Sequence, residues 1–248
     1  MSRPLPILIL AATEIELSDL RERAGSAGTI GEQPVEIAAT GVGKANAAFS
    51  AGTLLVARDY RAIFNIGCAG AFPSSGLSVG DVVLADREVF ADEGVLTPDG
   101  FLDLERLGFA LHEPPGAPPV FNGIPITPPM RFAAREIAAL AAELGFRLRA
   151  GPLCTVSTCS GLDAAAAEIA RRYSPLAESM EGAALALAAL RCGLPFLEVR
   201  GISNMTGDRD RAHWDIPLAC RRAAQAAARI IERAPEWFPP SAARLPRP

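Results

Sequence analysis

Short apolar runs rich in leucine and β-branched residues alternate along this chain with alanine-rich segments. The runs end in glycine or alanine, and the segments between them repeat apolar residues three and four positions apart. This alternation is typical of strand–helix units that build a mainly parallel sheet. The sequence therefore predicts an α/β fold, with a central mixed, mostly parallel β-sheet flanked by helices.

The same pattern gives the positions of the predicted elements. Strands are predicted at Leu5–Ala11, Val35–Thr40, Ala62–Ile66, Asp81–Ala85, Leu153–Val156 and Phe196–Ile202. Helices are predicted at Lys44–Ala57, Arg131–Leu144, Ala164–Arg172, Glu181–Arg191 and Ile216–Glu232. Together they predict one domain over residues 1–248.

Two segments of the chain are rich in proline. Residues 112–129 are predicted to form a long surface loop, either a lid or a simple decoration, because proline lacks a backbone donor and fixes φ. Residues 235–248 are predicted to be a flexible tail.

Composition excludes several classes of protein. The 248 residues carry a formal net charge of -4 and no basic run, so nucleic acid is not an expected partner. No segment has the roughly 20 apolar residues that span a bilayer, and no targeting signal is recognised, so no membrane is expected. Five cysteines without C-x-x-C spacing and two isolated histidines predict neither a metal site nor disulfides. Reduced thiols indicate the cytoplasm.

Two glycine-rich segments follow predicted strands. Residues 41–46 (G-V-G-K-A-N) open a helix as a dinucleotide fingerprint does, but asparagine stands at the third glycine position. Residues 65–71 (N-I-G-C-A-G-A) are predicted to be a second tight turn. Each segment alone is more typical of close strand–helix packing. Together they predict two turns at the carboxyl edge of one sheet, where open α/β sheets bind ligands.

Polar residues extend this pattern to other predicted strand ends: Glu14 and Glu16, the pair Met180-Glu181, and Arg200 followed by Ser203-Asn204. These features resemble five motifs of the nucleosidase branch of the nucleoside phosphorylase superfamily. In chain order the motifs are the acidic pair, the two glycine segments, the Met-Glu pair and the segment from Arg200 to Asn204. The resemblance extends from Ala11 to Asn204 and implies the fold of that superfamily.

The resemblance also implies roles for the matching residues. Glu16 corresponds to the carboxylate that activates the attacking water, and Glu181 to the one that binds the ribose hydroxyls. Arg200 and Cys68 correspond to positions that help to hold the water, although Cys68 replaces a residue that is commonly serine. Asn204 corresponds to the position that reads the purine. Further expected substrate-binding residues are Gly70, Cys159, Met180, Ser203 and Trp214.

The chemistry of N-glycosidic cleavage requires such residue types. The bond breaks through an oxocarbenium-like state, so the enzyme needs a base for water and stabilisation of the leaving purine. Glu16 supplies the base, and Glu181 orients the ribose. Asp208 or Asp210 is a candidate acid for the purine, or a cap of the following helix.

The nucleophile follows from a comparison within the superfamily. Phosphorylases of the superfamily hold phosphate with several arginines, and the matching segments 10–13 and 64–67 contain none. The sequence therefore predicts a hydrolase that uses water and neither a metal nor an organic cofactor.

Asn204 indicates which base leaves. An amide donates to a 6-oxo group and accepts from N7–H, whereas the aspartate usual for adenine-type substrates would set acceptor against acceptor. Hypoxanthine is therefore favoured, and segments 92–101, 202–210 and 214–219 resemble the futalosine hydrolases. This resemblance implies hydrolysis of futalosine to hypoxanthine and dehypoxanthine futalosine in menaquinone biosynthesis. Arg209 or Arg211 is a candidate partner for the substrate carboxylate, or part of a solvated charge run.

Several alternatives remain open at this point. Within the class they are a methylthioadenosine/adenosylhomocysteine or aminodeoxyfutalosine nucleosidase and a purine-nucleoside phosphorylase. From another class, the chain is a nucleoside-binding protein without catalysis. The expected partners are a small nucleoside and further copies of the chain, since the resemblance implies a homo-oligomer, a dimer or higher.

Overall fold

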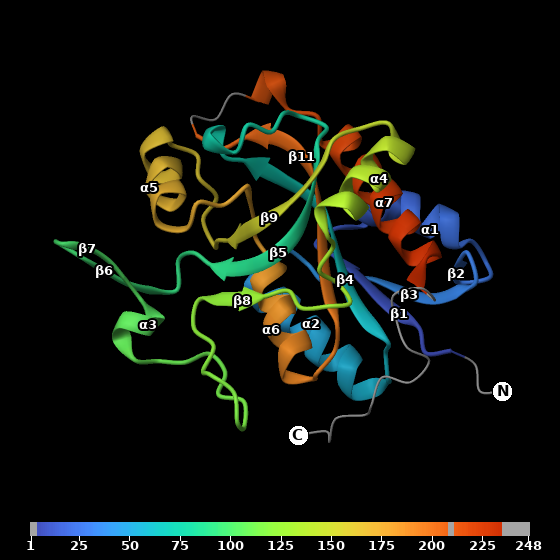
Figure 1. Ribbon diagram of the computed structural model, residues 1–248, viewed down its shortest axis with the longest axis horizontal. Coiled ribbons are helices and arrows are strands. Elements are labelled where there is room, and N and C mark those ends of the chain that lie inside the picture. The colour runs from blue at the N-terminus through green and yellow to red at the C-terminus, as the bar shows by residue number, and fades with distance from the viewer. Residues whose placement is uncertain (1–3, 208–210, 235–248) are drawn as a thin grey trace.

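The computed structural model describes residues 4–207 and 211–234. In this part of the chain, nine strands form one mixed sheet and two more form a hairpin (Figure 1). The nine strands are β1 (Ile7–Ala11), β2 (Thr29–Ile30), β3 (Gln33–Ala39), β4 (Ala62–Ala71), β5 (Val82–Phe90), β8 (Gly123–Pro125), β9 (Leu148–Thr155), β10 (Ala177–Ser179) and β11 (Phe196–Met205). The hairpin consists of β6 (Gly94–Thr97) and β7 (Gly100–Asp103). The predicted fold class is confirmed.

Five strands of the sheet close into a ring. Along the order β10-β9-β5-β11-β4, the last strand pairs again with the first. Strands β1, β3 and β2 extend the sheet outward from β4. Strands β1, β3, β4 and β11 are parallel, whereas β5 is antiparallel to β11 and β10 is antiparallel to β4. The carboxyl ends of the first four therefore meet at one end of the sheet.

The prediction of a tight turn at residues 65–71 is wrong, because β4 continues through them to Ala71. Strand β4 pairs with β1 over Ala62–Asn65 and with β10 at Gly70 and Ala71. The strand thus changes its partner within the segment. Its glycines carry no side chains, and this lets neighbouring groups approach closely where the ring closes.

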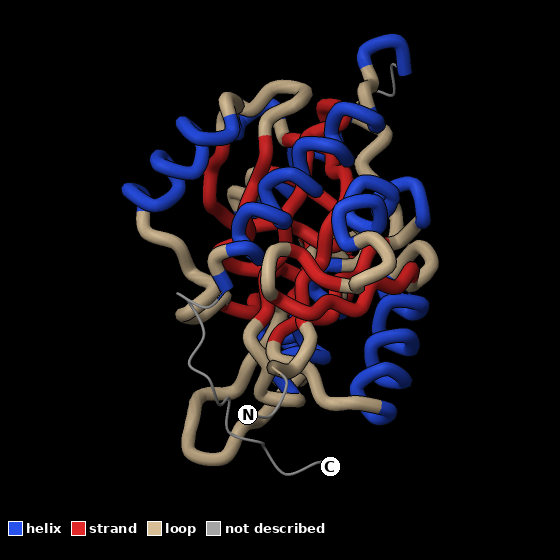
Figure 2. The backbone as a smooth tube through the Cα atoms, turned by 90° about the vertical axis from the view of Figure 1, so that its right-hand side faces the viewer, coloured by secondary structure: helices blue, strands red, loops and turns tan. Residues whose placement is uncertain are grey.

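Helices cover the sheet on both sides. They are α1 (Glu14–Ala24), α2 (Lys44–Ala57), α3 (Leu104–Leu107), α4 (Ala134–Leu144), α5 (Asp163–Tyr173), α6 (Gly182–Arg191) and α7 (Ile216–Glu232), with 3₁₀ turns at Pro73–Ser75 and Arg211–His213. Figure 1 shows α1, α4 and α7 on one side and α2 and α6 on the other. In Figure 2 the strands form the centre and helices lie around them.

Helix α7 packs directly on strand β11. Its inner face is made of small residues such as Ala219 and Ala223, which are fully buried. On the strand, a Cβ at Gly201 would lie 2.0 Å from the carbonyl oxygen of Ala219. Glycine and alanine therefore let the helix approach the strand that carries Arg200.

The sequence pattern located some elements better than others. The predicted helices Lys44–Ala57 and Ile216–Glu232 match α2 and α7, whereas α1 was not predicted. Helix α1 is mostly polar, and its buried apolar residues are Leu17, Leu20 and Ala24. These are three and four residues apart, which is the helical spacing that indicates a buried face.

The prediction for residues 112–129 is correct only in part. Gly123–Pro125 forms β8, which pairs with β5. His112 also forms an isolated bridge with Val120. A strand that contains proline is compatible with the margin of a sheet, where one side of the backbone has no partner strand. The tail at 235–248 lies outside the described residues.

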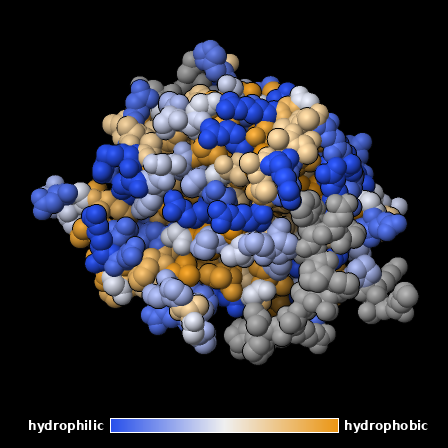
Figure 3. All heavy atoms as spheres, viewed as in Figure 1, coloured by the Kyte–Doolittle hydropathy of each residue, from blue (hydrophilic) through white to orange (hydrophobic). Residues whose placement is uncertain are grey.

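The surface mixes polar and apolar groups. Figure 3 shows hydrophilic side chains over much of the face seen in Figure 1, with apolar patches between them. Among the helices in the described part of the chain, none has the length and apolar character needed to cross a membrane.

Candidate active site

One cavity of about 390 Å³ brings together every predicted site residue that the structure describes. These residues are Glu16, Cys68, Gly70, Cys159, Met180, Glu181, Arg200, Ser203, Asn204 and Trp214. They come from the start of α1, from β4 and β11, from the loop after β9, from the link between β10 and α6, and from the residues just before α7. Asp208, with Arg209 and Asp210, lies outside the described residues.

Glu16 lies in the first turn of α1, and its two carboxylate oxygens have different partners. Thr13 donates to Oε2 from its backbone N–H and from its hydroxyl, both at 3.0 Å. The backbone N–H of Cys68 donates to Oε1 at 3.1 Å. The contact with Thr13 is half of a capping box, so helix formation itself orients the carboxylate. Oε1 is thereby held against β4, inside the cavity.

Arg200 is only 1% exposed and contacts three carboxylates. Its Nη1 lies 3.7 Å from Oε1 of Glu16, and its Nη2 donates to Oε2 of Glu181 at 3.3 Å. Its Nε donates to Oε1 of Glu198. Burial opposes the charge, but attraction by the three carboxylates prevails and raises the pKa of Arg200. A permanent cation therefore lies between the acidic groups.

Gly67 on β4 allows Glu16 and Arg200 to meet. A Cβ at this position would lie 2.2 Å from Oε1 of Glu16 and 2.5 Å from Nη1 of Arg200. Both distances are shorter than any real contact of a methyl carbon. Glycine is therefore required where the strand passes between the carboxylate and the guanidinium.

Glu181 precedes the first residue of α6 and is 3% exposed. Besides its contact with Arg200, it accepts a hydrogen bond on Oε1 from the backbone N–H of Gly43 at 3.0 Å. Gly43 belongs to the first glycine-rich segment, so this segment positions a carboxylate. The segment therefore has a role besides opening α2.

Lys44 ties the same segment to the residues that follow β5. Its ammonium group donates to Asp92 at 2.6 Å and to Glu93 at 2.7 Å. Asp92 in turn accepts from the backbone N–H of Ser157 at 2.6 Å. The ion pairs thus connect α2, the end of β5 and the loop after β9, which carries Cys159.

Asn204 lies on β11 and pairs with Gly70, three residues further along β4 than Gly67, which lies between Glu16 and Arg200. Its Oδ1 accepts from the hydroxyl of Ser203 at 2.8 Å, and its Nδ2 donates to the carbonyl of Met205 at 2.9 Å. A Cβ on the neighbouring Gly70 would lie 3.1 Å from Nδ2. Gly70 therefore leaves room beside the amide, as a flat ring would need.

Cys68 contacts the charged groups through its backbone. Its N–H donates to Glu16, and its carbonyl accepts from Nη1 of Arg200 at 3.3 Å. Its thiol lies in hydrogen-bond contact with Cys220, and that contact, together with burial, raises the pKa of the Cys220 thiol. Because the contacts with Glu16 and Arg200 need no particular side chain, cysteine can replace serine here without changing them.

Comparison with known proteins agrees with this geometry. The sequence profile described as "Phosphorylase superfamily" matches residues 6–235. The chain belongs to the phosphorylase superfamily. Futalosine hydrolases from Acidothermus cellulolyticus and Streptomyces coelicolor are 39% and 36% identical to it, over 83% and 82% of this chain and 79% and 81% of theirs. The futalosine hydrolases are therefore its family within the superfamily, and the predicted resemblance is confirmed.

A solved structure shows the same superfamily fold. The S-adenosylhomocysteine nucleosidase of Streptococcus pyogenes, in complex with 5-methylthiotubericidin, is 27% identical and superposes with a TM-score of 0.72. The similarity covers 94% of this chain and 98% of that one.

This phosphorylase-superfamily chain also buries two carboxylates that the sequence analysis did not select. Glu88 on β5 and Glu198 on β11 are both 0% exposed. A Cβ at Gly182 would lie 1.8 Å from Oε2 of Glu198 and 2.6 Å from Oε2 of Glu88, so the two oxygens are close to each other. Burial and the adjacent Glu198 raise the pKa of Glu88 well above its ordinary value. Burial and the neighbouring carboxylate therefore both favour the neutral, protonated form of Glu88.

Replacing Glu88 by glutamine tests this protonation state. The raised pKa means that wild-type protein takes up a proton on folding once the pH exceeds the ordinary value of about 4.3. Its stability then falls as pH rises, by at most about 1.4 kcal/mol per pH unit from this group. Glutamine stays neutral, so we expect Glu88→Gln to gain melting temperature over wild type progressively between pH 5 and pH 8. Melting curves at several pH values measure this.

The matched control for this experiment is Glu22→Gln, which changes an exposed acid on α1. The difference in melting temperature between Glu22→Gln and wild type is expected to vary little with pH. If the Glu88→Gln difference is also constant between pH 5 and pH 8, Glu88 is ionised in the folded protein and the assignment is wrong.

Other residues of the site were also missed from the sequence. Glu198 precedes Arg200 by two positions on a strand, so both side chains point to the same face, and this spacing could have identified it. Glu178 and Ser160 line the cavity as well. Glu178 precedes Met180 by the same two positions, but the strand β10 is only three residues long and gives no clear pattern.

Arg209 and Arg211 are the two candidates for binding the substrate carboxylate, and the structure describes Arg211. Its guanidinium lies over the ring of Trp214, 5.7 Å from the centroid. Trp214 lines the cavity and Arg211 does not, so Arg211 is connected to the cavity only by its contact with this tryptophan. The arrangement is compatible with cation–π attraction.

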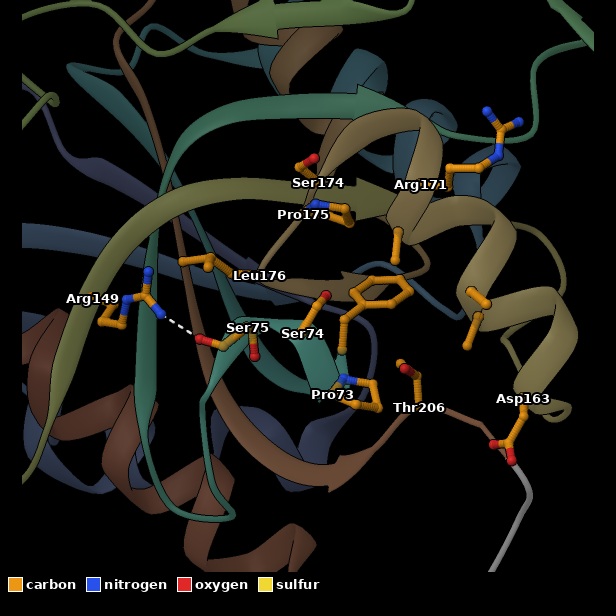
Figure 4. A pocket seen from close by; sticks show the side chains of 14 residues that line it. Pro73, Ser74, Ser75, Arg149, Asp163, Arg171, Ser174, Pro175, Leu176 and Thr206 are labelled. Carbon is orange, nitrogen blue, oxygen red and sulfur yellow. Dashed lines mark hydrogen bonds between the residues drawn. The ribbon is translucent and has the colours of Figure 1, made fainter.

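A second hollow, of about 830 Å³, lies between α5 and the turn at Pro73–Ser75 (Figure 4). Its charged side chains are already engaged or diverge. Arg149 donates to the carbonyl of Ser75, and Arg171 pairs with Glu168. In Figure 4, Arg171 points away from Arg149. The hollow therefore lacks the convergent acid and base groups of the smaller cavity.

Proposed function

We propose that this protein hydrolyses the N-glycosidic bond of futalosine, releasing hypoxanthine and dehypoxanthine futalosine. The observation that carries the proposal is one cavity lined by the Glu16–Arg200 pair, Glu181 and Asn204. The relatives named futalosine hydrolase support the choice of substrate.

The proposed reaction begins with water held between Glu16 and Arg200. Glu16 takes a proton from this water as its oxygen attacks C1′ of the ribose. Glu181 binds the 2′ and 3′ hydroxyls, and its negative charge stabilises the positive charge that develops on the ring. The C1′–N9 bond breaks, and its electron pair leaves with the purine.

The leaving purine must be stabilised at N7. Asn204 is proposed to accept a hydrogen bond from N7–H and to donate to the 6-oxo group. An amide does not supply the proton itself, and Asp208, outside the described residues, stays the predicted candidate for that role. Side chains and water suffice for all these steps, so the proposed reaction needs neither a metal nor an organic cofactor.

Water is favoured over phosphate by the charges in the cavity. Among the described residues that line it, Arg200 is the only cation. Its guanidinium is already paired with three carboxylates. A phosphate dianion placed there would face Glu16 and Glu181 without a cation of its own, which is electrostatically unfavourable.

The proposed function is tested by base release from futalosine, inosine and methylthioadenosine, each with and without phosphate. We expect hypoxanthine from futalosine at a rate that does not depend on phosphate. Dependence on phosphate would contradict the hydrolase mechanism and indicate a phosphorylase. Release of adenine alone would indicate a methylthioadenosine or adenosylhomocysteine nucleosidase. Binding without any release would indicate a nucleoside-binding protein.

We further propose one functional unit over residues 1–248, acting in the cytoplasm in menaquinone biosynthesis. None of the five cysteines forms a disulfide, which supports a reducing compartment. A homo-oligomer is supported by large apolar side chains that are exposed near the mouth of the cavity. Val42, which lines the cavity just before α2, is 52% exposed, and Phe49 on α2 is 77% exposed.

A further inference from the structure

Glu178 is a buried carboxylate with no part in the reaction steps above. It lies on β10, is 5% exposed and lines the cavity. Since burying a carboxylate is costly without a specific partner, its position in a ligand cavity requires an explanation.

The strand register places Glu178 at the base end of the cavity. Glu178 on β10 and Asn204 on β11 both pair with Gly70 on β4, from opposite sides. Their backbones are therefore two strand spacings apart, on the order of 10 Å. Gly70 has no side chain to fill the space between them. Glu16 and Arg200 lie instead beside Gly67, three residues earlier on β4.

The hydrogen bonds of Glu178 leave acceptor sites open on its carboxylate. Ser160 donates to Oε1 from its backbone N–H and to Oε2 from its hydroxyl, both at 2.7 Å. Burial raises the pKa of Glu178 above its ordinary value, and the two bonds from Ser160 offset part of this effect by stabilising the carboxylate. A carboxylate has about four lone-pair sites, so two remain for a donor in the cavity.

A purine with a 6-oxo group presents such a donor. Its N1 carries a hydrogen, whereas N1 of a 6-aminopurine carries a lone pair that a carboxylate would repel. We propose that Glu178 accepts the N1–H of the base while Asn204 binds its O6 and N7 edge. The inference rests on the proposed function and identifies the substrate class as 6-oxopurine nucleosides. Two residues on opposite sides of Gly70 then read the base, instead of Asn204 alone.

Substituting Glu178 by glutamine tests the proposal, because an amide accepts from N1–H or donates to a bare N1. The measurement is kcat/KM for inosine relative to adenosine and for futalosine relative to its 6-amino counterpart. We expect the 6-oxo preference of wild type to fall about 10- to 100-fold, as for loss of one hydrogen bond to a charged group. Glu105→Gln on the surface is the control and should keep the wild-type ratio. An unchanged ratio in Glu178→Gln overturns the proposal.

A second measurement uses unmodified protein and does not depend on how the variant folds. Calorimetry compares hypoxanthine with 1-deazahypoxanthine, in which C–H replaces N1–H. We expect at least tenfold weaker binding of the deaza base, and equal affinity overturns the proposal. If the protein hydrolyses futalosine but binds both bases with equal affinity, only the role of Glu178 is contradicted and the proposed function stands. A protein that binds neither base and cleaves no nucleoside removes the proposed function as well.

Discussion

Replacing Glu16 by glutamine is expected to lower kcat by roughly two to four orders of magnitude, the range for loss of a general base. The amide has the shape of the carboxylate but does not take the proton from water. It still accepts one hydrogen bond, so the first turn of α1 is expected to remain. Because Arg200, Glu181 and Asn204 are unchanged, we expect the dissociation constant of hypoxanthine to change only a few-fold.

Single-turnover kinetics with futalosine and calorimetry with hypoxanthine separate the chemical step from binding. The matched control is Glu14→Gln, two residues earlier on the same helix. Glu14 is an exposed acid that pairs with Arg21 at 2.8 Å and does not line the cavity. Its kcat should stay at the wild-type value. An unchanged kcat in Glu16→Gln would show that another group activates the water.

Replacing Arg200 by methionine is expected to cause the largest loss of stability. The substitution keeps an apolar stem of similar length but removes the cation that faces Glu16, Glu181 and Glu198. Leaving buried charges without a partner costs about 3–5 kcal/mol. For a chain of this length, we expect a fall in melting temperature on the order of 10 °C. Activity should fall as well, because Glu181 then keeps only its hydrogen bond from Gly43 and Glu16 loses the facing cation.

Two further variants separate charge from shape in the Arg200 experiment. Arg200→Lys keeps the positive charge without the planar fork, so it should lose less stability than methionine. Adding Glu198→Gln to Arg200→Met removes one unpaired charge and should restore part of the stability. The double variant should therefore lose less stability than the sum of the two single variants. A shift of 2 °C corresponds to roughly 1 kcal/mol. If Arg200→Met melts within about 2 °C of wild type, the three carboxylates do not need the guanidinium for the stability of the fold.

The candidate site could be predicted from sequence because its residues follow strands that run in one direction. Glu16 comes after β1, Cys68 lies near the end of β4, and Asn204 lies near the end of β11, and all three strands are parallel. Parallel strands bring such ends together at one edge. The sequence order of the motifs was therefore enough to group these residues in one cavity.

The Met180-Glu181 motif selected Glu181, but the position of Glu181 and Glu178 in the fold depends on a strand contact that no local pattern indicates. Strand β10 is three residues long and runs antiparallel to β4, where it closes the ring. The prediction instead placed a turn at residues 65–71, because glycine and alanine there give no strand signal of their own. Pairing with β10 and β11 on both sides of the strand overrode that weak local preference.

The sequence by itself determined the alternation of strands and helices, the family and the residue types available for the chemistry. These are local properties, set by periodicity and by short motifs. Only the tertiary structure decided that β4 passes from β1 to β10, that Arg200 lies among three carboxylates, and that Glu178 shares the base end of the cavity with Asn204. These features arise from pairing and burial between different strands and helices, and some of the partners, such as Glu16 and Arg200, are more than a hundred residues apart. There the energy of the assembled sheet outweighs local propensity.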